Sequence, residues 1–253
     1  MPSNFTLQDI FGILLAISLF PFVFVFPGYV IGWVLDLFDF KRRTSIAQII
    51  MAMPVSASIV PAGAFLIYRF TSSTFVIGIL ILLAIIGIYI FTKFYKPSSH
   101  DNEYRKLAVT FALLWITLSI LTLVDLQIDG RLYFSTNSYD LTTRVSVVDA
   151  ITRTGVPPVN PSYYPGHPVL LNFLYYYWYI LASIVDQMGG GLVSAYQAMI
   201  ASVSWAGILL FATLATYLRV RDKQSSQHAW KKSFMAIQFF AVGGLDLDRK
   251  RHV

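Results

Sequence analysis

The sequence of 253 residues contains no cysteine, so disulfide bonds, thiolate metal sites and cysteine nucleophiles are excluded. Charged residues are also scarce: they make up 13% of the chain, against roughly a quarter in a soluble domain. Glutamate occurs once, and the four histidines are scattered without the spacing of metal ligands. Hydrophobic residues, by contrast, make up 56% of the chain. This balance excludes an ordinary soluble domain and predicts an all-α protein whose main partner is the lipid bilayer.

The net charge of +6 has a different meaning in such a chain from the one it has in a soluble protein. A soluble domain with this charge would suggest nucleic acid as a partner. In a membrane protein, Lys and Arg mark cytoplasmic loops that face an anionic membrane surface. We therefore expect no nucleic-acid partner.

Long apolar stretches predict a polytopic transmembrane helical bundle with five full spans. The first stretch is interrupted by Pro21 and by Pro27-Gly28, and we expect one kinked helix there. The expected spans cover residues 10–35, 46–68, 74–91, 107–124 and 192–218. We treat residues 1–253 as a single membrane domain, with a three-span region at 1–106 and a second module at 107–253 that contains a polar loop at 125–166.

The distribution of Lys and Arg predicts the topology. Lys41-Arg42-Arg43 places the first loop in the cytoplasm, which makes the N-terminus and the 125–166 loop external. The basic tail at 219–232 is then cytoplasmic only if residues 168–186 do not cross the membrane. That segment contains five consecutive Tyr and Trp residues, which prefer the membrane interface, so we expect an interfacial Tyr-rich helix. An ordinary sixth span is the alternative.

Within the polar loop, residues 140–154 have helical spacing, and four apolar residues share one face: Leu141, Val145, Val148 and Ile151. Gly155 and the following Pro157-Pro158 end the helix. We expect an external amphipathic helix on the outer membrane face.

The same helix carries two acid–base pairs at a spacing of four residues. The pair of Asp149 and Arg153 is interpreted as a solvated ion pair. Asp140, which can pair with Arg144, could act as a general base or bind a divalent cation. An acid at a helix start can also simply favour the helix dipole, and both interpretations stay open.

A family resemblance is carried by Asp140, Arg144, Ala150-Ile151, Arg153, Gly155, Pro157-Pro158 and the aromatic block at 175–178. This pattern looks like the first external loop of GT-C-type glycosyltransferases, membrane enzymes that take a sugar from a polyprenyl-phosphate donor. The run PPVNP before the tyrosine triplet also resembles bacterial and archaeal membrane proteins known for a YYY motif. The resemblance covers residues 107–246 and implies a protein of a prokaryotic plasma membrane.

The resemblance implies roles for individual residues. Asp140 matches the catalytic base or metal ligand, with Mg²⁺ or Mn²⁺ as the cation. Asp246, in Gly243-Gly244-Leu245-Asp246, matches a second external acid. Substrate binding is implied for these residues: Arg144, Arg153, His167, Asn160 and Tyr177. Leu141 stands where many members have a second acid.

Members of the family continue for several further spans. On this basis the chain is expected to be truncated and to need a missing C-terminal half or a partner subunit for activity.

Three functions compete at this point. The first is a membrane glycosyltransferase that uses a polyprenyl-phosphate sugar. The second is a non-catalytic membrane protein, either a transferase remnant or a lipid-binding subunit. The third, a transporter or channel, predicts ionisable residues in the middle of spans, and the expected spans contain none.

Overall fold

The computed structural model describes residues 5–95, 101–133, 135, 138–162, 169–171 and 177–221. Helices dominate this part of the chain, in agreement with the predicted all-α class. The elements in chain order are α1 (Phe5–Leu19), α2 (Pro21–Phe24), α3 (Phe26–Leu35), the 3-10 turn η1 (Phe40–Arg42), α4 (Ser45–Tyr68), α5 (Ser73–Lys93), α6 (Asp101–Leu123), β1 (Leu126–Ile128), β2 (Arg131–Tyr133), α7 (Ser138–Thr154), α8 (Tyr177–Met188) and α9 (Ala195–Arg221).

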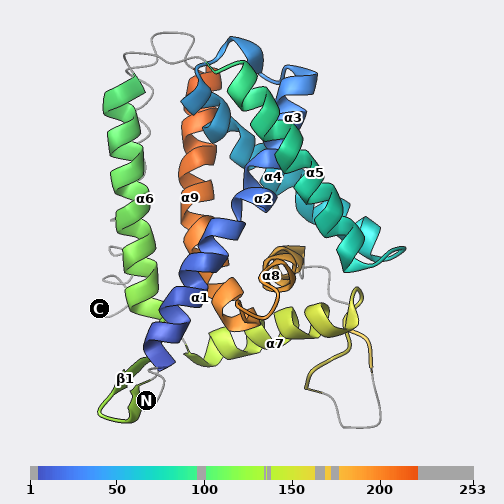
Figure 1. The fold of residues 1–253 in the computed structure, drawn as a ribbon, viewed down its shortest axis with the longest axis vertical. Helices are drawn as coiled ribbons and strands as arrows, with labels where there is room; N and C mark the ends of the chain where they lie inside the picture. Colours follow the sequence, from blue (N-terminus) through green and yellow to red (C-terminus); the bar gives the residue numbers. More distant parts are fainter. Residues whose placement is uncertain are drawn as a thin grey trace, which may run out of the picture.

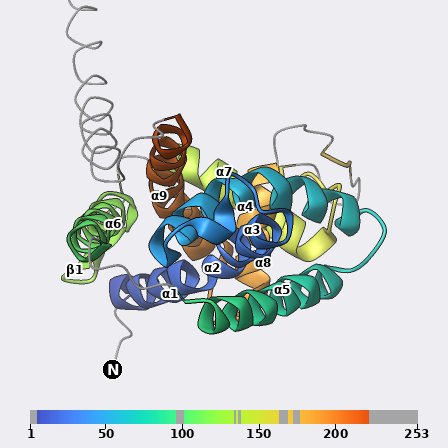
Figure 2. The same cartoon turned by 90° about the horizontal axis from the view of Figure 1, so that it is seen from above.

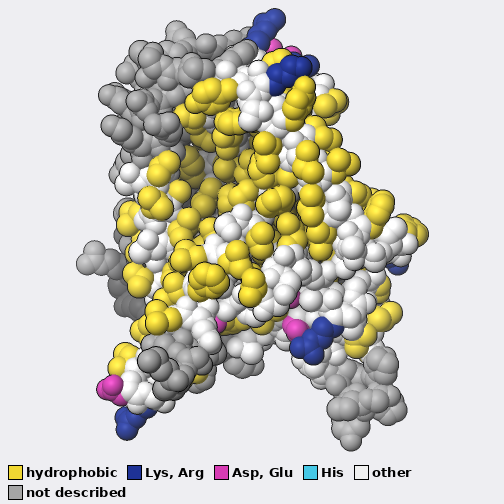
Figure 3. All heavy atoms as spheres, in the orientation of Figure 1, with side chains coloured by type: hydrophobic (Ala, Val, Ile, Leu, Met, Phe, Trp, Pro, Cys, Tyr) yellow, Lys and Arg dark blue, Asp and Glu magenta, His cyan; other side chains and the backbone are white. Residues whose placement is uncertain are grey.

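Four described helices are long and apolar enough to cross a membrane. They cover Thr6–Leu35, Ser45–Tyr68, Ser73–Lys93 and Ala195–Leu218, and they correspond to four of the five expected spans. The fifth expected span lies in α6, where the described apolar stretch, Val109–Leu123, is shorter. Apolar side chains cover the flank of the molecule, whereas charged side chains gather at its two ends (Figure 3). These features are those of a membrane protein.

The long helices run roughly side by side, and α7 lies across one end of them (Figure 1). This end, called the α7 end below, also holds the start of α1, the β1–β2 hairpin and the start of α9. The opposite end holds η1, the end of α5 and the start of α6. Seen from above, α6 stands at the edge of the molecule, where it packs on α9 (Figure 2).

The first span is a broken helix, as the two prolines predict. Its helical segments are separated at Phe20 and at Val25, next to Pro21 and the Phe26–Pro27 pair. A proline inside a span leaves backbone groups that need another partner. One such partner comes from α4: the Gly28 backbone N–H donates to Ser56 Oγ over 2.6 Å. The break therefore brings α3 directly against α4.

The amphipathic helix predicted at 140–154 is confirmed as α7, Ser138–Thr154. Leu141, Val148 and Ile151 are buried, and Val145 packs against them. The surroundings of this face differ from the expectation. The apolar face of α7 packs on α8 and α9 of the same chain, so it contacts protein where we expected lipid.

The Tyr-rich run also differs in part from its expectation. Its described portion, α8, has 12 residues and spans about 18 Å, which is too short to cross a membrane. Figure 1 shows α8 nearly end-on, so its axis crosses those of the long helices. Residues 180–185 are completely or almost completely buried between α4, α7 and α9. An interior position replaces the expected surface position because the apolar residues of α8 pack into the protein core; they are Ile180, Leu181, Ala182, Ile184 and Val185.

The β1–β2 hairpin was not expected from the sequence. Its two strands pair antiparallel from Leu126↔Tyr133 to Ile128↔Arg131. Asp129 and Gly130 form the turn between them, both with positive φ, which is the backbone that an Asp-Gly hairpin turn requires. The hairpin carries the chain from α6 to α7 at the α7 end.

Candidate functional site

A polar pocket of about 330 Å³ opens at the α7 end. It lies between the turn that joins α4 to α5, the last turn of α7 and the end of α8. Most of its lining side chains carry a hydroxyl, amide or guanidinium group. The lining residues are Tyr68, Thr71, Ser72, Ser73, Ile151, Thr152, Arg153, Thr154, Gly155, Val156 and Gln187. Such groups bind sugars and phosphates.

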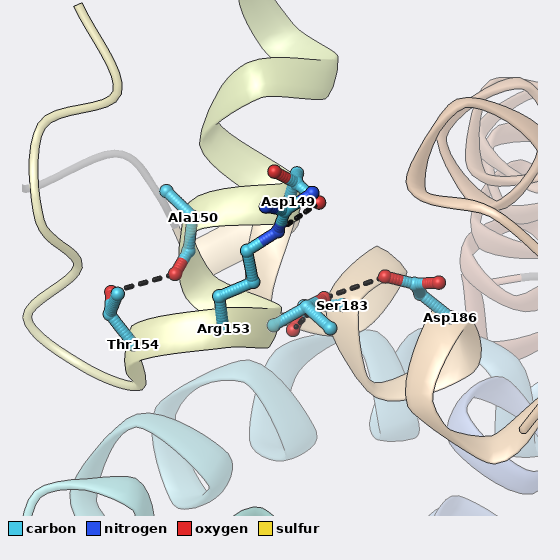
Figure 4. Close-up of polar contacts among 7 residues, drawn as sticks. Asp149, Ala150, Arg153, Thr154, Ser183 and Asp186 are labelled. Atoms are coloured by element: carbon cyan, nitrogen blue, oxygen red, sulfur yellow. Dashed lines mark hydrogen bonds and ion pairs between the residues drawn. The ribbon is translucent and has the colours of Figure 1, made fainter. Parts of the chain in front are cut away.

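Hydrogen bonds connect the helices around this pocket. Thr152 Oγ1 donates to Asp186 Oδ2 over 2.7 Å and lies 3.1 Å from Ser183 Oγ (Figure 4). The Gln187 amide donates to Ser183 Oγ over 3.1 Å and to the Tyr68 hydroxyl over 3.4 Å. The network joins α7, α8 and the end of α4, so it fixes the three walls relative to one another.

The sequence at the end of α7 explains why the pocket forms there. Gly155 has φ +81°, a left-handed conformation that ends the helix as predicted. Thr154 Oγ1 donates to the Ala150 carbonyl over 2.7 Å and accepts the Val159 N–H over 3.0 Å. These bonds turn the chain away after α7 and leave the side chain of Arg153 at the pocket.

Asp186 is the acidic residue of this network. Burial raises its pKa above the ordinary value of 3.8, while the hydrogen bond from Thr152 opposes that shift. Smaller effects come from Asp149, which raises the pKa, and from Arg153, which lowers it. The folded protein therefore holds a proton on Asp186 more tightly than the unfolded chain does.

This shift predicts a pH-dependent effect of Asp186→Asn. With a raised folded-state pKa, the contribution of Asp186 to stability is complete below pH 3.8 and is lost as pH rises through the folded-state pKa. Asparagine removes that loss and can still accept the hydrogen bond from Thr152. The Tm of the variant relative to wild type should therefore increase between about pH 4 and pH 7. Thermal unfolding in detergent at a series of pH values checks this. If the Tm of the two proteins changed with pH in parallel, burial would not disfavour the Asp186 carboxylate.

The acid–base pairs on α7 form as the spacing predicts. Asp140 and Arg144 are joined over 2.8 Å, and Asp149 and Arg153 over 2.9 Å. The Asp149–Arg153 pair is solvated, as expected, since the two side chains are 41% and 73% exposed. Asp140 is also exposed, at 71%. Arg153 lies thirteen positions after Asp140, which is about 20 Å along the axis of α7. The two side chains therefore cannot contact the same small chemical group of a ligand.

Other sequence-predicted residues lie apart. The Asn160 side chain accepts the Ser162 backbone N–H over 3.0 Å, in a local turn. The Tyr177 ring packs against Phe65 with centroids 4.8 Å apart. His167 and Asp246 lie outside the described residues. Of the residues implied by the resemblance, Arg153 alone is among the described lining residues of the polar pocket.

Sequence reasoning missed Asp186 and its neighbours. Ser183, Asp186 and Gln187 follow a spacing of three and four residues, which places them on one face of α8. This polar face inside an apolar run was the available signal. Tyr68 and the turn after it carried no signal, because only the fold brings them beside α7.

Two further features bear on ligands. Within the described residues, no group of three or more His, Asp or Glu side chains could hold a metal ion. A second hollow, an apolar groove of about 290 Å³, lies between α4, α6 and α9. Its lining comes from the half of α4 that is remote from Tyr68, so it is not continuous with the polar pocket.

Comparison with known proteins gives one distant relative. The chain is 25% identical over 211 residues to the uncharacterized protein y4nK of Sinorhizobium fredii. The match covers 80% of this chain and 30% of y4nK, so the chain spans less than a third of the length of that relative. No family model matches the chain. No solved structure matches it either.

Proposed function

We propose that the protein takes part in transferring a sugar from a polyprenyl-phosphate donor, as GT-C-type membrane glycosyltransferases do. The observation that carries the proposal is the polar pocket at one end of an apolar helical bundle. A lipid-linked sugar has the same division, because its chain lies in the membrane while its phosphate and sugar need polar partners at the surface. In this proposal the protein is a multi-pass protein of a prokaryotic plasma membrane, with the α7 end and the N-terminus external.

Arg153 is the residue in the pocket that fits an anionic ligand. Its Nε donates to Asp149 Oδ1, its side chain is 73% exposed, and the residue lines the pocket. A guanidinium can bind a phosphate through two parallel hydrogen bonds. The hydroxyl and amide groups around it suit the hydroxyls of a sugar. We assign the pocket to a polar part of the substrate that is remote from the reacting carbon.

Asp140 keeps the catalytic role implied by the resemblance. Its carboxylate is exposed at the first turn of α7, where an acceptor or a Mg²⁺ or Mn²⁺ ion can reach it. The distance of about 20 Å along the helix means that Asp140 and the pocket act on different parts of the substrate. Because y4nK is matched over 30% of its length, transfer is proposed for the form of the protein that carries a complete site.

The two roles predict different kinetic effects. Removing a remote binding group should raise KM and leave kcat unchanged, because it weakens ground state and transition state equally. A hydrogen bond to a charged group contributes about 1.5–3 kcal/mol, so Arg153→Ala should raise KM for the polyprenyl-phosphate sugar about 10- to 100-fold. Initial rates against donor concentration measure this. Arg131→Ala is the matched control, because Arg131 lies in exposed β2 at the same end, outside the pocket.

The same pair of variants tests binding without turnover. The purified chain in detergent should bind a short-chain polyprenyl-phosphate hexose, and Arg153→Ala should weaken that binding while Arg131→Ala should not. Equal effects of the two substitutions would indicate non-specific attraction between positive charge and the phosphate. That result would remove the pocket from the proposal.

A second candidate function is a non-catalytic membrane protein that binds lipid-linked sugars. It is favoured by the position of Asp140, which pairs with Arg144 and lies away from the pocket. In this case Arg153→Ala would still weaken binding. Asp140→Asn would then have no effect on sugar transfer measured in the organism or in a reconstituted system.

A further inference from the structure

A second polar cluster lies at the α7 end, where the start of α1, the end of α6 and the start of α9 meet. It contains Asp9 and Asp125, which are only 5% and 8% exposed. Asp9 Oδ1 accepts the Gln197 amide over 2.9 Å, and Asp125 Oδ1 accepts the Ser135 backbone N–H over 2.8 Å. The two carboxylates are close enough to affect each other electrostatically. The cluster therefore places two acids of like charge in one buried region.

Neighbouring contacts fix the cluster in place. Thr6 Oγ1 donates to the Asp125 carbonyl over 3.1 Å and accepts the Gln127 N–H over 2.7 Å, which ties α1 to β1. The Tyr196 hydroxyl donates to the Leu123 carbonyl over 3.1 Å and lies against the Asp125 carboxylate. A side chain at Gly12 would collide with Gln197, so the glycine provides the room that this amide needs to reach Asp9. The chain thus brings segments 188 residues apart to one point.

The negative charge of this cluster has no basic partner in the described part of the chain. Neither of the ion pairs on α7 includes Asp9 or Asp125. A buried carboxylate without a compensating charge costs several kcal/mol. A proton or a cation must therefore offset the charge.

The hydrogen bonds favour a cation over a proton. Asp9 Oδ2 and Ser135 Oγ are buried and have no hydrogen-bond partner among the described residues. A proton shared by the two acids would neutralise only one of them and would leave the Ser135 hydroxyl without a partner among the described residues. A metal ion at Asp9 Oδ2 would satisfy that oxygen and offset the charge of both acids.

We propose that Asp9 and Asp125 bind a hard divalent cation of the Mg²⁺ or Ca²⁺ kind at this junction. Carboxylate and hydroxyl oxygens are the ligands that these ions prefer, and Mg²⁺ is commonly held by one or two carboxylates with water completing its shell. Asp9 Oδ2, the Asp125 carboxylate and the Ser135 hydroxyl supply protein oxygens, and Gln197 positions Asp9. The ion joins α1, the segment after α6 and the region of α9, so its role is to hold the α7 end together. It is separate from any cation at Asp140.

Thermal unfolding of the purified full chain in detergent tests this site. After treatment with a chelator, addition of saturating Mg²⁺ or Ca²⁺ should raise the Tm of wild type by about 5 °C. Asp9→Asn and Asp125→Asn should abolish the rise. In chelator, Asp9→Asn should be more stable than wild type, because it removes a buried charge that then has no partner. Asp149→Asn, which removes an exposed acid from α7, should keep the full response.

Terbium luminescence gives a second readout that does not depend on unfolding. Tb³⁺ binds sites of this kind and emits when a neighbouring tyrosine is excited, and Tyr196 lies against Asp125. Asp125→Asn should abolish this emission, and excess Ca²⁺ should displace the ion. If wild type shows no cation-dependent change in Tm, or if both asparagine variants keep the wild-type response, the site does not exist.

Discussion

Asp140→Asn should lower the rate of sugar transfer at least about 100-fold in a form of the protein that carries out transfer, because a general base contributes about 10²- to 10⁴-fold. The substitution preserves the shape of the side chain and removes its charge. Because the Asp140 side chain is 71% exposed, the variant should fold normally. Single-turnover measurements with a polyprenyl-phosphate sugar give the rate of the transfer step.

Asp149→Asn is the matched control on the same helix. Asp149 also pairs with an arginine four residues away, in an exposed ion pair that contributes little to stability. Its replacement should leave the transfer rate within about a factor of three, which corresponds to less than 1 kcal/mol. If Asp140→Asn also stayed within that range, the role of Asp140 would be limited to favouring the start of α7 through the helix dipole.

Gly28→Val should have the largest effect on folding. A side chain at Gly28 would collide with the Ala52 carbonyl oxygen and with Ser56, so the backbones of α3 and α4 touch at this point. Valine would also separate the Gly28 N–H from Ser56 Oγ. Overpacking of this kind costs about 3 kcal/mol, which should lower the Tm in detergent by about 10 °C.

Gly78→Val and Gly63→Val make the same change in α5 and α4. Apart from the backbone of the same helix, no described atom lies within 4 Å of a Cβ placed at either position. Both variants should unfold within about 2 °C of wild type, since surface substitutions usually change stability by less than 0.5 kcal/mol. A small effect at Gly28, equal to that of these controls, would mean that α3 and α4 do not pack as described.

The elements that could be predicted from the sequence are those whose signal is local. The apolar stretches identify four helices that can cross a membrane, and Pro21 and Pro27 locate the breaks in the first. The spacing of Leu141 to Ile151 and the glycine at 155 give the face and the end of α7. Each of these features depends on neighbouring residues alone.

The environment of these elements depends on the fold, and the sequence did not reveal it. An apolar helix face looks the same whether lipid or protein covers it, so α7 and α8 were expected at a lipid surface and are packed within the chain. The pocket joins Tyr68 to Arg153 and Gln187, which are far apart in sequence. Asp9 gave no signal in the sequence, because a single acid near a helix start is common. Its interaction with Asp125 is long-range in sequence and depends on the fold.

Single-cysteine labelling in intact cells tests most directly whether α7 and the polar pocket are external, and the absence of natural cysteines makes the experiment clean. Cysteines at Ser72, which lines the polar pocket, and at Ser162, which follows α7, should react with a membrane-impermeant maleimide, because both positions are exposed. Cysteines at Ser98 and Ser226, which lie outside the described residues, should react only after the membrane is permeabilised. Labelling at Ser226 but not at Ser98 would show that the chain crosses the membrane once more between them. Labelling at Ser98 with protection at Ser162 would place α7 and the pocket inside the cell and contradict the proposed external site.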